Sequence, residues 1–140
     1  MAATVTLEGN VGQDPEIKYV SNSSTNAICN LRVVTSRGIK QEDGSWENTE
    51  ETWWTVTAFN RLAENVVDSL SKGDPVIVTG RAFIEKYKNR DGEDRQNLKV
   101  IAYKIGLDFS RRTAEVYKMD SAKNGAREPS AFSENDFAPF

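Results

Sequence analysis

Two aromatic residues, Trp53 and Phe59, lie six positions apart in a segment that has the composition of a β-strand. Residues 52–59 are rich in β-branched and aromatic side chains, and the side chains of a strand alternate between its two faces. Trp53 and Phe59 therefore share one face with Thr55 and Thr57. The opposite row, predicted to face the core, consists of Trp54, Val56 and Ala58.

The face that carries Trp53 and Phe59 has the chemistry of a nucleobase-binding surface. The two rings are separated by about 20 Å along the strand. A flat ring exposed on a sheet can stack on a nucleobase, and such stacking contributes about 1–3 kcal/mol per base with little dependence on sequence. Considered alone, the strand leaves an alternative open, in which both rings fill a second core or a contact between subunits.

Many residue types and patterns typical of catalytic sites are missing. The chain contains no histidine, which excludes Ser–His and Cys–His nucleophilic sites and most zinc sites. The glycine patterns of phosphate-binding and dinucleotide-binding loops are also missing. The acidic residues cluster in polar, loop-like stretches, where carboxylates are normally solvated. The sequence therefore predicts a binding protein without a metal site, rather than an enzyme.

Length and composition predict one domain with an appendage. The chain has 140 residues, of which 38% are hydrophobic and 28% charged, and no apolar run is long enough for a transmembrane helix. We expect a cytoplasmic protein, because the N-terminus lacks the basic and then apolar pattern of a signal peptide. The lone cysteine, Cys29, alternates with apolar residues and is predicted to be buried.

The formal net charge of −3 does not by itself favour a nucleic-acid partner. Five acidic residues, however, lie within residues 42–51. Without these five, residues 1–109 carry 13 basic and 11 acidic side chains. A locally basic groove is therefore compatible with the composition, although the sequence does not demonstrate one.

Hydrophobic periodicity predicts five strands, with one helix between the third and the fourth. The strands are expected at residues 4–11, 27–35, 52–59, 76–87 and 96–105. The apolar stripe of residues 61–70 predicts the helix, with Asn60 as its N-cap and Lys72-Gly73 after its end. Turns are predicted at two Asp-Gly pairs, Asp43-Gly44 within the long excursion 37–51 and Asp91-Gly92 within the hairpin tip 88–94.

The region of the first strand carries three smaller signals. Gly9 predicts a bend or bulge inside the strand. The residues Gln13-Asp14-Pro15 predict a turn, and residues 16–19 predict a short extended piece after it.

This order of elements is that of an OB-fold barrel, which is an all-β fold. In an OB-fold, an oligonucleotide lies across the second and third strands, so Trp53 and Phe59 would lie on or beside its path. We therefore expect an OB-fold binding domain over residues 1–109. Residues 110–140 have few aliphatic side chains and predict a largely disordered tail, with a helix extension over 111–119 as a weaker expectation.

Several stretches resemble the bacterial single-stranded DNA-binding proteins over the whole length of the chain. The matching stretches are residues 9–16 (GNVGQDPE), Trp53 to Phe59, residues 61–64 (RLAE), Lys72-Gly73, residues 78–80 (VTG) and an acidic end that closes on Pro139-Phe140. The resemblance implies an OB-fold homotetramer that binds single-stranded DNA without sequence preference and needs no cofactor. It also implies a cytoplasmic, nucleoid-associated protein of DNA replication, recombination and repair.

The resemblance also implies roles for individual residues. Trp53, Phe59 and Tyr87 match base-stacking positions of the family. Basic residues that match phosphate-contacting positions are Lys18, Arg61, Lys72 and Lys86. The family often has a tryptophan where this chain has Ile39, and Trp46 either substitutes for it from the hairpin arm or packs within that arm.

Two further positions depart from the family pattern and bear on assembly. Phe83 replaces a residue that is often basic, and we expect it to pack or to form a subunit contact. Trp54 replaces a residue that is commonly polar and near a subunit contact, which leaves the geometry of the tetramer open.

The end of the chain resembles the partner-binding tip of the same family. We expect a mobile hook that binds replication, recombination and repair proteins, with Phe140 in an apolar pocket and carboxylates at its basic rim. The residues of this tip are Glu134, Asp136, Phe137, Pro139 and Phe140. Family tips usually carry three adjacent acids, whereas this one has two, and a frayed terminus without function is the alternative.

The sequence leaves two other functions open. One is an OB-fold protein that binds RNA, since the 2′-hydroxyl is recognised through geometry that the sequence does not reveal. The other is an OB-fold module for protein assembly that has lost DNA binding, an interpretation that Ile39 and the negative net charge favour.

Overall fold

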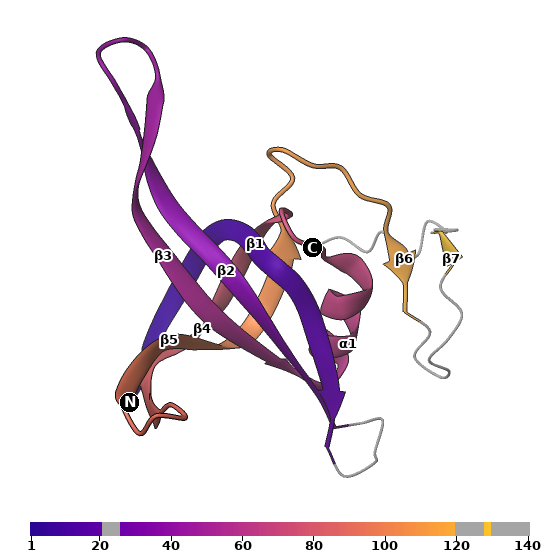
Figure 1. The fold of residues 1–140 in the computed structure, drawn as a ribbon. Helices are drawn as coiled ribbons and strands as arrows, with labels where there is room; N and C mark the ends of the chain where they lie inside the picture. Colours follow the sequence, from indigo (N-terminus) through magenta and orange to yellow (C-terminus); the bar gives the residue numbers. More distant parts are fainter. Residues whose placement is uncertain (21–25, 120–127, 130–140) are drawn as a thin grey trace.

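Five long strands close into a barrel in the order β1-β2-β3-β5-β4, with β4 pairing back onto β1 (Figure 1). The computed structural model describes residues 1–20, 26–119 and 128–129. The barrel strands are β1 (Ala3–Tyr19), β2 (Ala27–Lys40), β3 (Trp46–Phe59), β4 (Pro75–Lys88) and β5 (Asp94–Leu107). Helix α1 (Asn60–Ser69) connects β3 to β4. The predicted five-stranded OB-fold with one helix between its third and fourth strands is therefore confirmed.

Strand β1 is long enough to pair with two strands, β4 and β2, and this double pairing closes the sheet into a barrel. Residues 3–10 pair with β4 and residues 10–19 pair with β2, both antiparallel. Gly9 lies where these pairings meet, and a Cβ atom there would lie 2.2 Å from the carbonyl oxygen of Val34. Glycine is thus required for close backbone approach. Of the bend or bulge predicted here, the bulge is wrong, because no register shift falls at Gly9.

The irregularities of β1 lie after Gly9. The register with β2 shifts between Val11 and Gln13 and again between Gln13 and Glu16. The turn predicted at Gln13-Asp14-Pro15 is therefore wrong. These residues distort a continuous strand, because β2 continues to pair on both sides of them. Residues 16–19 are extended, as predicted.

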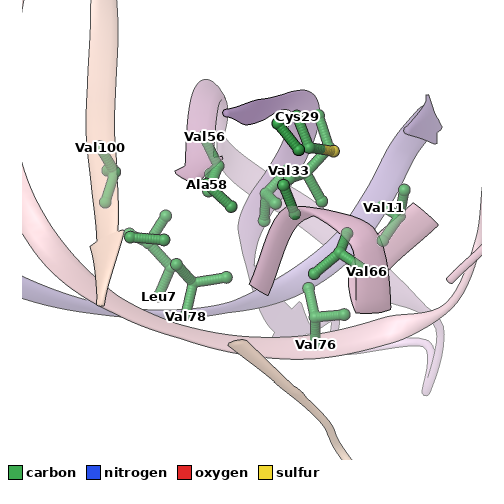
Figure 2. Packing of buried hydrophobic residues seen from close by; sticks show 14 residues of the cluster. Leu7, Val11, Cys29, Val33, Val56, Ala58, Val66, Val76, Val78 and Val100 are labelled. Carbon is green, nitrogen blue, oxygen red and sulfur yellow. The ribbon is translucent and has the colours of Figure 1, made fainter. Parts of the chain in front are cut away.

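The core fills the barrel with side chains from every barrel strand and from one face of α1 (Figure 2). Its buried members include Leu7, Val11, Cys29, Leu31, Val33, Val56, Ala58, Ala63, Val66, Val76, Val78 and Val100. Trp54 packs against this cluster, and its Nε1 donates a hydrogen bond to Oγ1 of Thr35 at 3.0 Å. Burial raises the pKa of the Cys29 thiol to about 11, so this thiol is neutral at pH 7.

The start of α1 differs from the prediction. Asn60 is the first helical residue and not the cap, and Phe59 in the cap position offers no side-chain hydrogen bond. Asn60 has a φ of 57°, a left-handed conformation that asparagine tolerates better than most residues. Its contribution is therefore to turn the chain from β3 into the helix. The helix ends at Ser69, and Gly73, with φ of 96°, lies in the loop that follows.

Two hairpins project from the barrel and end in turns of the same form (Figure 1). We call residues 37–51 the β2–β3 arm and residues 86–95 the β4–β5 arm. In the first, the N–H of Gln41 donates to Ser45 O at 2.7 Å, and the N–H of Gly44 donates to Gln41 O at 3.0 Å. In the second, Asn89 pairs with Glu93 and Gly92 with Asn89 in the same pattern, both at 3.0 Å. Both Asp-Gly turns were predicted.

The described residues after β5, 108–119 and 128–129, form no helix. Residues 111–119 are irregular except for β6 (Tyr117–Lys118), which pairs with β7 (Glu128–Pro129), so the helix considered for 111–119 is wrong. Arg112 holds the start of this segment to the barrel through Asp74, with 3.8 Å between Nε and Oδ1. The predicted partner-binding tip, residues 134–140, lies outside the described residues. None of the helices that the structure describes has the length and apolar character to span a bilayer.

Candidate nucleic-acid interface

The outward face of β1, β2 and β3 consists of side chains aligned in rows across the strands. Strand pairing sets these rows, because directly paired residues of antiparallel strands point to the same face. From one end of the face to the other, the rows are Lys18–Ile28–Phe59, Glu16–Asn30–Thr57, Gln13–Arg32–Thr55 and Val34–Trp53. The two predicted stacking rings therefore lie at opposite ends of one surface.

Trp53 is exposed over 42% of its surface and is held on three sides. Its Nε1 donates to Glu51 Oε1 at 3.1 Å. The guanidinium carbon of Arg32 lies 5.4 Å from the centroid of its ring. Its benzo edge lies over Gly12, where a Cβ atom would be 2.5 Å from Cζ3. The ring is thus fixed in place while a large part of it stays accessible.

Phe59 lies at the other end of the face and is also 42% exposed. It shares its row with Ile28 and with Lys18, whose side chain is exposed. Arg61 follows two residues later in the first turn of α1 and is exposed as well. Two of the predicted phosphate-binding cations therefore lie near this ring: Lys18 across the sheet and Arg61 along the chain.

The floor between the rings is polar and internally bonded. The hydroxyl of Thr57 donates to Asn30 Oδ1 at 2.7 Å, and that of Thr55 donates to Asn97 Oδ1 at 3.0 Å. Thr57 is only 4% exposed despite its outward position. The two hydroxyls between the rings thus bind neighbouring strands, β2 and β5, which helps to fix the floor.

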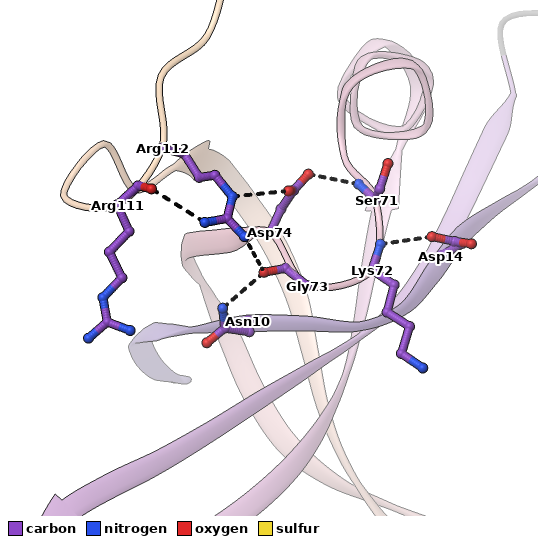
Figure 3. Close-up of polar contacts among 8 residues, drawn as sticks. All are labelled: Asn10, Asp14, Ser71, Lys72, Gly73, Asp74, Arg111 and Arg112. Atoms are coloured by element: carbon purple, nitrogen blue, oxygen red, sulfur yellow. Dashed lines mark hydrogen bonds and ion pairs between the residues drawn. The ribbon is translucent and has the colours of Figure 1, made fainter.

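Lys72 lies near the Trp53 end, on a loop that is fastened to β1 (Figure 3). The N–H of Gly73 donates to the Val11 carbonyl at 2.7 Å, and the N–H of Lys72 donates to Asp14 Oδ1 at 2.7 Å. These bonds flank Gly12, on which the Trp53 ring lies. The Lys72 side chain points away from the loop and is exposed.

Tyr87 and Lys86 lie on the β4–β5 arm, apart from the rows just described. Tyr87 is 49% exposed and pairs with Arg95. Lys86 is the next residue along the strand and pairs with Gln96, so its side chain starts from the opposite face. Both nevertheless line a hollow of about 500 Å³ at the end of the arm. The hollow is lined by Lys86, Tyr87, Lys88, Asp94, Arg95 and Gln96.

Trp46 lies on the β2–β3 arm and is 69% exposed, more than any other aromatic residue in the described part of the chain. Its ring runs along the backbone of Gly38, where a Cβ atom would be 3.5 Å from Cε3, an ordinary contact. Trp46 lies seven positions before Trp53 in β3, a distance of about 23 Å. Trp46 therefore does not join the two rings on the barrel face: its ring lies beside Gly38 within the arm and leaves most of its surface exposed.

Phe83 lies on the outer face of β4 with Arg81, whose guanidinium carbon is 5.5 Å from the ring centroid. It is partly exposed and pairs with Lys99, which is bound to Glu85 at 3.2 Å. Trp54 points into the barrel, so in this structure the position after Trp53 belongs to the core.

Two residues of the face were not identified from the sequence. Gly12 lies against the Trp53 ring, and Arg32 contacts the same ring from β2. Gly12 lies within the matched stretch 9–16 but has no signal of its own. Arg32 could have been found, because it is a basic residue at an outward position of a strand whose other face is apolar. Residues 1–20, 26–119 and 128–129 contain no group of three or more potential metal ligands.

Comparisons with known proteins agree on one family. The sequence model of the single-strand binding protein family matches residues 2–108. The single-stranded DNA-binding protein of Corynebacterium glutamicum is 35% identical over 121 residues, which are 86% of this chain and 53% of that protein. The chain thus spans about half the length of this relative.

Two further comparisons cover more of the other protein. The single-stranded DNA-binding protein of Mycobacterium leprae is 34% identical over 116 residues, which are 82% of this chain and 68% of that protein. The crystal structure of a small single-stranded DNA-binding protein from Streptomyces coelicolor superposes with a TM-score of 0.70 and 26% identity. That superposition covers 80% of this chain and 99% of the other.

Proposed function

The chain belongs to the single-strand binding protein family, and from this premise we propose that it binds single-stranded DNA without sequence preference. Proteins of this family are non-enzymatic DNA-binding proteins, which agrees with the binding protein predicted from the sequence. The observation that carries the proposal is the pair of half-exposed rings, Trp53 and Phe59, at the two ends of one outward face. Stacking on such rings tolerates any base.

Phosphate contacts complete the proposed mechanism. Lys18 and Arg61 lie near the Phe59 end of the face, and Lys72 lies near the Trp53 end. Tyr87 and Lys86 extend the path onto the β4–β5 arm, and Trp46 offers a further ring on the β2–β3 arm. Contacts of this kind are electrostatic and weaken as salt rises.

We extend the proposal to assembly and partners on the strength of the family resemblance. The protein acts as a homotetramer in DNA replication, recombination and repair, in the nucleoid of the cytoplasm. Its partners bind the terminal residues 134–140. The partly exposed Ile77 and Phe83 on the outer face of β4 are apolar surface that a subunit contact can cover. The mass of the protein in solution, measured by light scattering, tests the tetramer.

The test of DNA binding compares three alanine variants. Trp53→Ala and Phe59→Ala are each expected to weaken binding of labelled oligo-dT by about 1–3 kcal/mol, because each removes one stacking ring. Tyr117→Ala is the control, since Tyr117 is also 42% exposed but lies in β6, outside the barrel. Fluorescence anisotropy measures the affinity, and circular dichroism verifies folding.

The same titration separates the three candidate functions. Unchanged affinity of the two folded ring variants would contradict the stacking role. Equal or tighter binding of oligo-U would favour an RNA-binding protein, because it would show no selection against the 2′-hydroxyl. Absence of binding to either oligonucleotide by the unaltered protein would favour the assembly module.

A further inference from the structure

Arg32 is a cation on the proposed DNA path that lacks a polar partner. Its guanidinium carries five N–H donors, yet within residues 1–20, 26–119 and 128–129 no hydrogen bond or ion pair involves it. Nε is covered and has no acceptor, whereas the two terminal nitrogens are not among the covered atoms. The contact with the Trp53 ring, at 5.4 Å from its centroid, is the interaction that holds the group.

An arginine whose guanidinium donors have no acceptor can bind an anion without first losing another polar contact. A covered polar atom without an acceptor is unfavourable. The remaining donors of the guanidinium can bind a ligand that comes from outside the protein. Guanidinium binds phosphate through two parallel N–H···O bonds, and it can do so while it stacks on an aromatic ring. The structure therefore offers a phosphate-binding group whose position the indole already fixes.

The location of Arg32 matches where a phosphate must pass. Its row, with Gln13 and Thr55, lies between the Trp53 row and the Phe59 row. The rings are about 20 Å apart, so they stack on different bases and the sugar-phosphate chain must cross the space between them. The two rows in this space also hold Gln13, Thr55, Thr57 and Asn30, which are neutral, and Glu16, an exposed acid on β1. Both threonine hydroxyls are already bonded, and Arg32 is the one cation of these two rows.

We propose that Arg32 binds a backbone phosphate of the single strand between the two stacking rings, next to Trp53, while its guanidinium stays on the Trp53 indole. This inference rests on the proposed function and adds a phosphate contact in the row beside Trp53. It also assigns Arg32 a second effect, because a cation above the indole fixes the ring on which a base stacks.

The test measures how oligo-dT affinity depends on salt. For single strands, each neutralised phosphate contributes about −0.7 to the slope of log K against log salt concentration. Arg32→Gln is expected to reduce the steepness by about 0.7 and to weaken binding at low salt by about tenfold. Arg32→Lys keeps the charge and should restore the slope, although it loses the planar, bidentate contact.

Controls separate this effect from loss of charge or of structure. Arg111→Gln removes one cation from the segment beyond β5 and should leave the slope nearly unchanged. Arg32→Met keeps an apolar stem against Trp53 and replaces the glutamine variant if that variant does not fold. Circular dichroism reports on the fold. Tryptophan emission, compared between each variant and the unaltered protein, reports on the indole environment, because Trp53 is the tryptophan that Arg32 contacts.

The outcomes distinguish the inference from the function on which it rests. If the unaltered protein binds oligo-dT with a steep salt dependence but Arg32→Gln and Arg32→Met keep its slope, the phosphate contact is refuted, even if affinity falls. A fall of equal size at every salt concentration would reveal a purely structural role for Arg32. If the unaltered protein does not bind oligo-dT, the proposed function itself fails.

Discussion

The two arms of the barrel have the same turn but opposite electrostatic character. Each closes on an Asp-Gly pair, with matching backbone hydrogen bonds and a glycine of positive φ, 89° at Gly44 and 79° at Gly92. Each also carries one exposed ring, Trp46 on the β2–β3 arm and Tyr87 on the β4–β5 arm. The β2–β3 arm, however, has five acidic and two basic residues, whereas the β4–β5 arm has four basic and three acidic residues.

This difference shows that an exposed ring alone does not define a nucleotide site. Stacking brings the phosphates of the same strand close to the ring, so the charges around the ring contribute to the binding energy. Tyr87 lines a hollow with three cations, Lys86, Lys88 and Arg95, and one acid, Asp94. Arg95 is paired with Glu93 at 3.1 Å, which leaves the two lysines as the donors proposed for a phosphate. Trp46 shares its arm with Glu42, Asp43 and Glu47, and hydrogen bonds from Ser45 lower the pKa of the Asp43 carboxyl.

The largest expected effect comes from removing the rings of the two arms, Tyr87 and Trp46, one at a time. Tyr87→Ala is expected to weaken oligo-dT binding by about 1–3 kcal/mol, because a base stacked there also places a phosphate in the basic hollow. Trp46→Ala is expected to cost less than about 0.5 kcal/mol, since repulsion by the acidic arm offsets stacking. Anisotropy titrations at low salt measure both. A larger loss for Trp46→Ala than for Tyr87→Ala would contradict this expectation, because the acidic arm would then make the stronger contact with the DNA.

Sequence periodicity was sufficient for most of the fold. The alternation of Ala27, Cys29, Leu31 and Val33 identified the inward face of β2, because a half-buried strand must alternate. The two Asp-Gly turns were predictable for a local reason, since glycine adopts positive φ without strain. Asn60 misled the prediction because asparagine favours both helix caps and left-handed backbone, and only the geometry at the end of β3 decides between them.

The candidate site was only partly predictable. Alternation placed Trp53 and Phe59 on one face, but the contacts that hold Trp53 come from Gly12 and Arg32 on other strands. Such contacts depend on the register between strands, which the pattern of a single strand does not determine. The same limit applies to Thr57, whose outward position predicted exposure, whereas the structure buries it beside Asn30.

The shared turn geometry gives a second, smaller prediction. Gly44→Ala and Gly92→Ala are each expected to lower the free energy of unfolding by about 1 kcal/mol, since alanine is strained at positive φ. The two losses should be equal, because neither glycine has any atom within 4 Å of the added Cβ. Urea denaturation followed by circular dichroism measures them. Clearly unequal losses would mean that one arm makes contacts which the common turn does not explain.

The smallest expected effects concern single charges on the two arms, and they should have opposite signs. Glu42→Gln removes an exposed acid from the β2–β3 arm and should tighten oligo-dT binding by less than about twofold at low salt. Lys88→Gln removes a cation of the hollow and should weaken binding by somewhat more, because Lys88 lies beside the proposed phosphate position. Both effects should fade near 1 M salt, where the screening length is about 3 Å. Changes of the same sign in the two variants would show that the strand does not distinguish the arms by charge.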